Sequence, residues 1–172
     1  MTDKPLHYLD SGVFSGFLNG EAEPDNFAEC EAVIRAAEQG LIRAFTSAFT
    51  MAEVVYIKPA PGKEALPVET QEEIIYQLLN STWLERVSFE PDMAEINRYL
   101  LRQFGGGKRA LQPYDSVHLA TAIRMKVDYF NTTDGELIKR LPNEINCPPR
   151  YLKLVVIQRP FVDKLQMQLP SL

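Results

Sequence analysis

The chain has 172 residues, of which 45% are hydrophobic and 24% are charged, and its formal net charge is −5 at pH 7. These values fit a globular protein, so we expect a single domain over residues 1–160 followed by a C-terminal tail over 161–172. The acidic balance argues against binding to nucleic acid by bulk electrostatics, which usually depends on a basic surface.

The chain alternates apolar runs of strand length with segments whose apolar residues recur at helical spacing. Prolines that open helices and glycines that end them set most of the boundaries. In the first half we expect a strand at 6–9, a short helix capped by Ser11, a helix from Pro24 to Gly40, a strand at 41–45, and a helix capped by Thr46 or Ser47 that ends before Pro59. In the second half we expect helices at 69–79, 91–104 and 113–125, strands at 83–89, 127–130 and 154–157, and a helix to Leu141 opened by a capping box of Thr133 and Glu136.

Strands that alternate with helices along the whole chain predict an α/β domain, with a parallel sheet covered by helices on both faces. Ligand sites in such sheets lie at the carboxyl ends of the strands. Two segments lack either periodic pattern, the proline-rich segment 59–67 and the glycine-rich segment 105–109. We expect both to be exposed turns.

No run of about 18 apolar residues is present, and the N-terminus lacks the apolar stretch of a signal peptide. The two cysteines, Cys30 and Cys147, are too few for a disulfide framework, which fits a reducing compartment. These features predict a cytoplasmic protein that does not enter a membrane.

Four carboxylates stand where expected strands end or in the first turns of the helices that follow: Asp10, Glu53, Asp115 and Asp134. Like charges brought together repel, so a cluster of this kind needs a proton or a shared divalent cation. Glu53 is the most informative of the four, because it interrupts an otherwise apolar helical segment and needs compensation if that face is buried. The set predicts a metal site.

Each acid also has a purely structural interpretation. Asp10 is placed to cap the next helix, and Glu53 can face solvent. Asp115 and Asp134 lie in first helical turns, where the positive end of the helix favours an acid whatever the function. The combination of the four residues therefore carries the prediction more than any one of them.

Two other features do not predict a site. The glycine-rich segment 105–109 lacks a phosphate-loop pattern, because residue 102 is Arg where that pattern needs Gly and Arg109 replaces its Ser or Thr. His118 lies one turn beyond Asp115, from where it could face the site, but with His7 as the only other histidine there is no zinc constellation. We therefore expect His118 to be a packed or surface histidine.

Four short blocks occur in a distinctive order along the chain. They are Tyr8-Leu9-Asp10-Ser11-Gly12-Val13, then Thr46-Ser47 with Glu53 six residues after the serine, then Tyr114-Asp115-Ser116-Val117-His118-Leu119-Ala120-Thr121-Ala122, and finally Phe130-Asn131-Thr132-Thr133-Asp134. Over roughly residues 6–157 the sequence thereby resembles the PIN domain family, specifically single-domain ribonucleases such as the VapC toxins of toxin–antitoxin pairs.

The resemblance implies a three-layer α/β/α domain with a flavodoxin-like or Rossmann-like parallel sheet, in which the four acids converge on Mg²⁺ or Mn²⁺. It implies Glu53 and Asp115 as central ligands, with Asp10 bridging and Asp134 acting directly or through water. Bound water or substrate would be held by supporting hydroxyls, which are those of Ser11, Ser47 and Thr132 or Thr133. In such proteins the metal activates water for attack on an RNA phosphodiester.

The implied function is a metal-dependent endoribonuclease, a hydrolase, that serves as the toxin of a type II toxin–antitoxin pair. RNA would be the substrate, with an antitoxin protein and a second copy of the chain as candidate partners. One alternative is a PIN-like module that binds protein or RNA without nuclease activity. Another is a phosphotransfer enzyme of the haloacid dehalogenase type, which ranks last because residue 12 is Gly where that chemistry needs a second aspartate.

Overall fold

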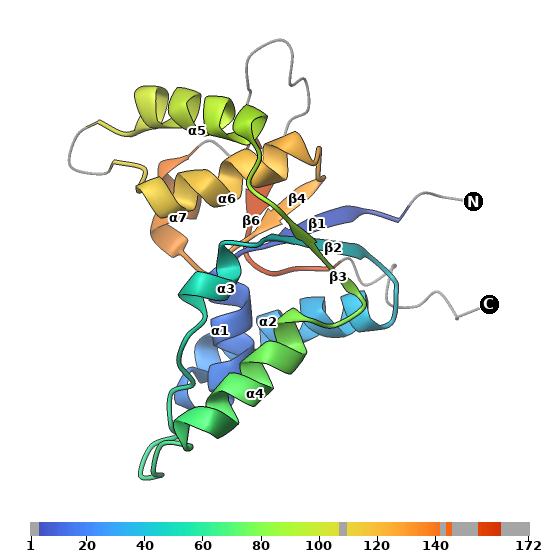
Figure 1. Ribbon diagram of the computed structural model, residues 1–172, viewed down its shortest axis with the longest axis vertical. Coiled ribbons are helices and arrows are strands. Elements are labelled where there is room, and N and C mark those ends of the chain that lie inside the picture. Colours follow the sequence, from blue (N-terminus) through green and yellow to red (C-terminus); the bar gives the residue numbers. More distant parts are fainter. Residues whose placement is uncertain (1–3, 107–109, 142–143, 146–154, 163–172) are drawn as a thin grey trace.

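The computed structural model describes residues 4–106, 110–141, 144–145 and 155–162 (Figure 1). Its strands are β1 (Leu6–Leu9), β2 (Arg43–Ser47), β3 (Leu84–Val87), β4 (Tyr129–Asn131), β5 (Glu144–Ile145) and β6 (Val155–Gln158). They form one sheet in the order β3-β2-β1-β4-β6-β5. β1, β2, β3, β4 and β6 are parallel, and the short β5 pairs antiparallel with β6. The predicted parallel sheet is therefore confirmed.

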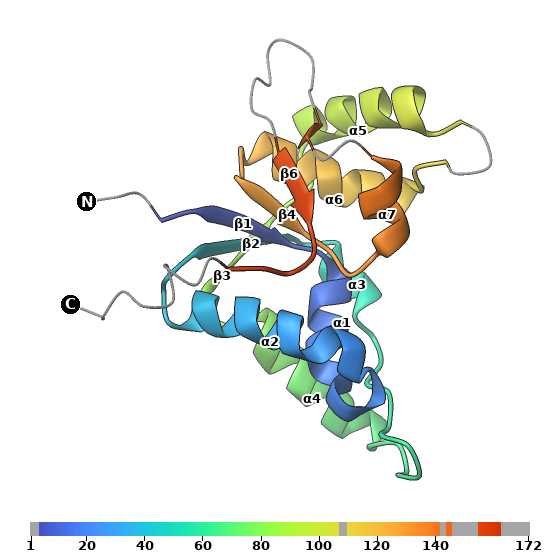
Figure 2. The ribbon, with the colours of Figure 1, turned by 180° about the vertical axis from the view of Figure 1, so that it is seen from behind.

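Helices cover the sheet on both faces, as Figures 1 and 2 show from opposite sides. One layer holds α1 (Ser11–Asn19), the short 3-10 helix η1 (Gly20–Ala22), α2 (Pro24–Glu38) and α4 (Val68–Leu79). The other holds α5 (Pro91–Phe104), α6 (Pro113–Arg124) and α7 (Gly135–Arg140). The single-turn α3 (Thr50–Glu53) follows β2. This is the predicted three-layer α/β/α arrangement.

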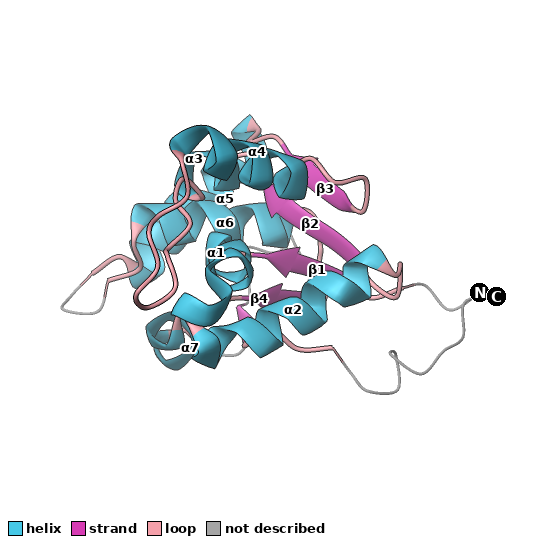
Figure 3. Cartoon of the chain, turned by 90° about the horizontal axis from the view of Figure 1, so that it is seen from below, coloured by secondary structure: helices cyan, strands magenta, loops and turns pink. Residues whose placement is uncertain are grey.

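The alternation of side chains along the central strands divides the core into two parts. Tyr8 and Phe45 are buried with the apolar residues of α5 and α6. Their neighbours Leu9 and Ala44 are buried on the opposite face, with residues of α1, α2 and α4. The view from below in Figure 3 shows α1 and α2 lying across that second face. Burial on both faces fixes the register of β1 and β2 and so the position of the residues that follow them.

The structure corrects the boundary between β2 and the next helix. We predicted that Thr46 or Ser47 caps a helix extending almost to Pro59, but both residues are buried in β2, and α3 covers only Thr50–Glu53. The Thr46 hydroxyl donates to the carbonyl of Leu9 on the neighbouring strand at 2.8 Å. Cross-strand bonding thus outweighs the local helical pattern.

Two predicted helix caps are also corrected. Asp10, not Ser11, caps α1, because its carboxylate accepts the Ser11 N–H, and this confirms the structural interpretation of Asp10 as a helix cap. Asp134, not Thr133, caps α7 and accepts the N–H groups of Glu136 and Leu137. In each case the residue one step from the expected cap is the one with the extended backbone that a cap requires, and it carries a carboxylate that the helix N-terminus favours.

Some predicted segments fall partly or wholly outside the described residues. Segment 59–67 is free of helix and strand, as predicted. Residues 107–109 of the glycine-rich segment, residues 163–172 of the predicted tail, and Cys147 lie outside the described residues, whereas Cys30 is buried. Within the described ranges, every helix is too short or too polar to cross a membrane.

Candidate active site

The ends of neighbouring parallel strands bring the first two predicted acids together. Asp10 directly follows β1, and Glu53 is the last residue of α3, which follows β2. In Figure 1 β1 runs into α1 and β2 runs into α3 on the same side of the sheet. Because β1 and β2 pair in parallel, their carboxyl ends meet at one edge, which is where sites form in this class of sheet.

Asp10 is a buried carboxylate, 9% exposed, whose two oxygens have different partners. Oδ1 accepts the backbone N–H of Ser11 at 2.8 Å, and Oδ2 accepts the hydroxyl of Thr132 at 2.8 Å. Burial raises the pKa of Asp10, and this effect exceeds the lowering by the nearby His118 charge and by these hydrogen bonds. Asp10 is therefore held in place by groups from two elements and carries a charge that burial disfavours.

His118 completes the connection between the two acids. It lies on α6, is only 1% exposed, and places Nε2 at 2.5 Å from Glu53 Oε2 and 3.8 Å from Asp10 Oδ1. Our prediction of a packed or surface histidine is correct about its burial, and the position of His118 beside Asp10 and Glu53 agrees with the alternative that it faces the site. The signal available in the sequence was its position three residues after Asp115, which puts both on one side of α6.

A second hydrogen bond fixes the ring of His118. Its Nδ1 lies 2.7 Å from the hydroxyl of Tyr8, which also accepts the N–H of Ser47 at 2.9 Å. The Tyr8 hydroxyl can donate to Nδ1 of the neutral ring or accept from the protonated ring. In both states Nε2 keeps its proton and donates it to Glu53.

Glu53 and His118 of this network shift each other's pKa values toward the charged forms. Burial alone would lower the pKa of His118, but the hydrogen bond to Glu53 and the charges of Asp10, Glu53 and Asp115 outweigh it and raise that pKa. Burial would likewise raise the pKa of Glu53, but its bonds with His118 and the Ser11 hydroxyl lower it overall. The raised pKa of His118 and the lowered pKa of Glu53 both favour the charged forms, and the ring of His118 lies against two carboxylates of the site.

The structure ties Asp115 and Asp134 to the network less directly. Asp115 is half-buried in the first turn of α6, and its charge acts on His118. Asp134 uses Oδ1 to cap α7, and its N–H donates at 3.1 Å to the Thr132 hydroxyl that holds Asp10. Asp134 is thus coupled to Asp10 through Thr132.

The four predicted supporting residues have distinct roles. Ser11 and Thr132 hydrogen-bond the acids, as described above. Ser47 donates its N–H to Tyr8, and its hydroxyl oxygen accepts the N–H of Phe49 at 3.2 Å. Thr133 packs against Gly12, where an added Cβ would collide with the Thr133 hydroxyl. Gly12 therefore allows α1 to approach the segment between β4 and α7 closely.

The donor set is chemically suited to a hard divalent cation, because carboxylate and hydroxyl oxygens are the ligands that Mg²⁺ and Mn²⁺ prefer. Among the residues that the structure describes, however, there is no group of three or more His, Cys, Asp or Glu side chains arranged to hold a metal ion. Asp10 and Glu53 instead share the imidazole of His118.

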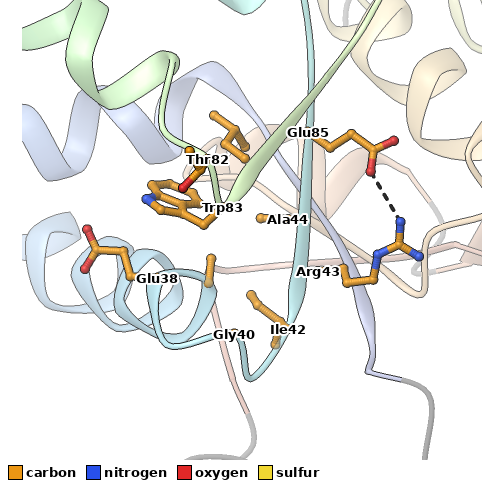
Figure 4. Close-up of a pocket in the computed structure, with 10 residues that line it drawn as sticks. Glu38, Gly40, Ile42, Arg43, Ala44, Thr82, Trp83 and Glu85 are labelled. Atoms are coloured by element: carbon orange, nitrogen blue, oxygen red, sulfur yellow. Dashed lines mark hydrogen bonds and ion pairs between the residues drawn. The ribbon is translucent and has the colours of Figure 1, made fainter.

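A pocket of about 510 Å³ lies at the other end of the sheet. Figure 4 shows residues that line it. It is lined by residues at the amino ends of β2 and β3, including Ile42 and Trp83, and by the exposed ion pair of Arg43 and Glu85. None of the predicted site residues lines this pocket. The acidic cluster, not the pocket, is therefore the candidate active site.

Comparison with known proteins supports the sequence resemblance. The model of the PIN domain family matches residues 7–143 of the chain. The fold is similar to VapC20 from Mycobacterium tuberculosis, described as a toxin that cleaves the sarcin-ricin loop, with 13% identity, a TM-score of 0.55, and coverage of 75% of this chain and 90% of that one.

Two protein–DNA complexes contain similar folds. VapBC2 from Rickettsia felis, bound to a DNA fragment from its promoter, gives 16% identity, a TM-score of 0.58, and coverage of 90% of this chain and 98% of that one. FitAB bound to the IR36 DNA fragment gives 19% identity, a TM-score of 0.50, and coverage of 74% and 85%. No curated protein matches the chain significantly.

Proposed function

The chain belongs to the PIN domain family, and from this premise we propose that it is a metal-dependent endoribonuclease that hydrolyses RNA phosphodiester bonds. The observation that carries the proposal is the network of Asp10, His118 and Glu53 at the carboxyl ends of parallel strands. Asp115 lies on helix α6 with His118, and its charge raises the pKa of His118. Two acids from separate parts of the chain, Asp10 and Glu53, thus lie against the same buried imidazole.

We assign Asp10, Glu53, Asp115 and Asp134 as the residues that hold Mg²⁺ or Mn²⁺. The cation would activate water and neutralise charge on the phosphate and the leaving oxygen. Thr132 and Ser11 orient Asp10, while Tyr8 and His118 orient Glu53. A carboxylate that is not fully neutralised by the cation can accept the proton of the attacking water.

We further propose that the chain is the toxin of a type II toxin–antitoxin pair and is neutralised by an antitoxin protein. Similarity to the fold of VapC20, described as a toxin, and to VapBC2 and FitAB supports this role. Expression of the chain alone should then arrest growth, and expression of Asp115→Asn should not. Normal growth with well-expressed wild-type chain would remove the toxin role and leave the nuclease proposal to be tested separately.

The test of the nuclease proposal is cleavage of a fluorogenic single-stranded RNA by the purified chain, with Mg²⁺, with Mn²⁺ or with chelator. We expect cleavage only with metal, and a loss of about 100-fold or more in Asp115→Asn. The matched control is Asp25→Asn, which removes an exposed acid from the first turn of α2 and should leave cleavage unchanged. Circular dichroism melting of both variants checks that the fold is intact.

One observation favours a second function. Because His118 Nε2 lies 2.5 Å from Glu53 and 3.8 Å from Asp10, both carboxylates have a partner without a metal ion, and the network would also suit a binding module without nuclease activity. Such a module should bind single-stranded RNA or a partner protein but show no turnover with either metal. Metal-dependent turnover that Asp115→Asn abolishes would exclude it.

A further inference from the structure

A stacked pair of aromatic rings lies at the edge of the acidic network. The rings of Phe49 and Tyr114 have centroids 5.5 Å apart and planes inclined by 21°. Phe49 immediately precedes α3, which ends at Glu53, and Tyr114 directly precedes Asp115 in the first turn of α6. The Phe49 ring is also 6.0 Å from the ring of His118. The pair therefore borders the site from both of the elements that supply its central acids.

The exposure of Tyr114 distinguishes it from a core aromatic residue. Tyr114 is 61% exposed, although its ring stacks on that of the half-buried Phe49. The other exposed aromatic residues, which are Tyr56, Tyr76, Phe89 and Phe161, pair with no ring among the residues that the structure describes. Phe49 thus supports a ring that remains largely open to solvent beside the acids.

We propose that Phe49 and Tyr114 form a stacking platform for one unpaired base of single-stranded RNA bound at the acidic site. Every base has a π-face, so aromatic stacking holds a strand without reading its sequence. The bases of an RNA duplex are already stacked on each other, so the platform selects loops or single strands. This inference rests on the proposed function and adds the class of RNA that the site accepts.

The charge of the chain favours stacking over phosphate contacts as the source of affinity. The net charge is −5, and several described cations already pair with carboxylates, such as Lys58 with Glu23 and Arg124 with Asp92. Binding through the phosphate backbone needs cations that are available to release counterions. A base held by aromatic rings needs none of them, so the platform can hold an RNA strand next to an acidic site.

The test is binding of a short fluorescent single-stranded RNA to the Asp115→Asn chain, measured by anisotropy so that cleavage does not interfere. In this background Tyr114→Ala should weaken binding by between about 5-fold and about 100-fold. Tyr114→Trp should retain the affinity, because the ring and not the hydroxyl makes the contact. The matched control is Tyr76→Ala, which removes an equally exposed tyrosine from α4 and should change nothing.

An RNA series with one abasic position at a time identifies the stacked base. We expect one abasic position to weaken binding to the chain with Tyr114, and to cause no further loss when Tyr114 is Ala. The same loss with and without Tyr114 would overturn the platform. So would unchanged RNA affinity in Tyr114→Ala, including the case in which that variant loses only a protein partner.

The outcomes separate this inference from the proposed function. Metal-dependent cleavage by the wild type, together with unchanged RNA binding in Tyr114→Ala, would overturn the platform and leave the nuclease standing. Binding that depends on Tyr114, in a chain that cuts no RNA with either metal, would support the platform and overturn the nuclease. Absence of any binding to single-stranded RNA would overturn the platform whatever the cleavage assay shows.

Discussion

The two histidines of the chain occupy two polar regions that burial alone does not distinguish. His7 on β1 and His118 on α6 are each 1% exposed. Burial lowers the pKa of His7 to about 4, because the charge of Asp128 and a hydrogen bond with Asn131 only partly oppose it. The pKa of His118 is raised, because Glu53, Asp10 and Asp115 together outweigh the same burial.

This contrast indicates that the number and proximity of carboxylates decide the direction in which the pKa of a buried imidazole shifts. His7 packs against Tyr129 with its ring centroid at 4.8 Å, and its Nε2 has no hydrogen-bond partner in the described structure. His118 has a partner on both ring nitrogens. The first region is therefore a neutral part of the core, and the second is an ionic network able to do chemistry.

Removing His118 should have the largest effect on stability. His118→Ala leaves Asp10 and Glu53 without the imidazole that they share, so we expect a loss of about 3 to 5 kcal/mol in the free energy of unfolding. Urea denaturation with chelator present measures this loss. A decrease below about 1 kcal/mol would show that the network does not depend on the imidazole and would remove the contrast with His7.

The pH dependence of the His118 contribution sharpens the comparison. A histidine with a raised folded pKa stabilises fully below its unfolded value of about 6.5, and this contribution is lost as pH rises through the folded pKa. The stability difference between wild type and His118→Gln should therefore shrink above pH 6.5. A difference that grows with pH would contradict the raised pKa.

His7 should show the opposite dependence. Its folded pKa of about 4 lies below the unfolded value of 6.5, so the unfolded chain binds the proton first as pH falls. As pH falls from 6.5 to 4, the contribution of His7 to the free energy of unfolding should therefore decrease by about 3 kcal/mol. The free energy of unfolding is measured for the wild type and for His7→Gln over this pH range. The difference isolates the effect of His7, since all other titratable groups are common to both chains. Parallel curves for the two chains would contradict the prediction.

The Tyr8 hydroxyl tests how the His118 ring is held. Tyr8→Phe removes one partner from the Ser47 N–H and one from His118 Nδ1, both buried, so we expect a loss of about 1 to 3 kcal/mol in stability. Thermal unfolding measures this loss, with Tyr76→Phe as the control because Tyr76 is 60% exposed. If both substitutions are equally mild, the hydroxyl is not needed to orient the ring.

The smallest effect is expected for an ion pair outside both regions. Arg43 and Glu85 lie 3.3 Å apart beside the pocket, with side chains 57% and 53% exposed. Glu85→Gln should cost less than about 1 kcal/mol, because solvent screens an exposed pair. A loss in urea denaturation as large as that of His118→Ala would show that burial is not what separates strong from weak pairs in this protein.

The sequence predicted the layers of the fold well. Apolar runs, prolines at helix starts and glycines at helix ends located most strands and helices, because these signals depend on neighbouring residues. It was less accurate at Thr46 and Ser47, where a strand continues through residues that resemble a helix cap. The bond from Thr46 to Leu9 joins two strands distant in sequence, and no local pattern contains it.

For the candidate site, too, some residues could be identified from the sequence and others only from the tertiary structure. The sequence by itself singled out Asp10 at the end of an apolar strand and Glu53 on an apolar helix, because a carboxylate is costly to bury there. Asp115 and Asp134 gained weight only in combination with these two, since a first helical turn favours an acid in any case. Only the tertiary structure decided that His118 lies between Asp10 and Glu53, since these three residues come from three different elements. The local sequence determines whether a segment forms a helix or a strand. The pKa of a buried group depends instead on neighbours that only the packing of elements brings within a few ångströms.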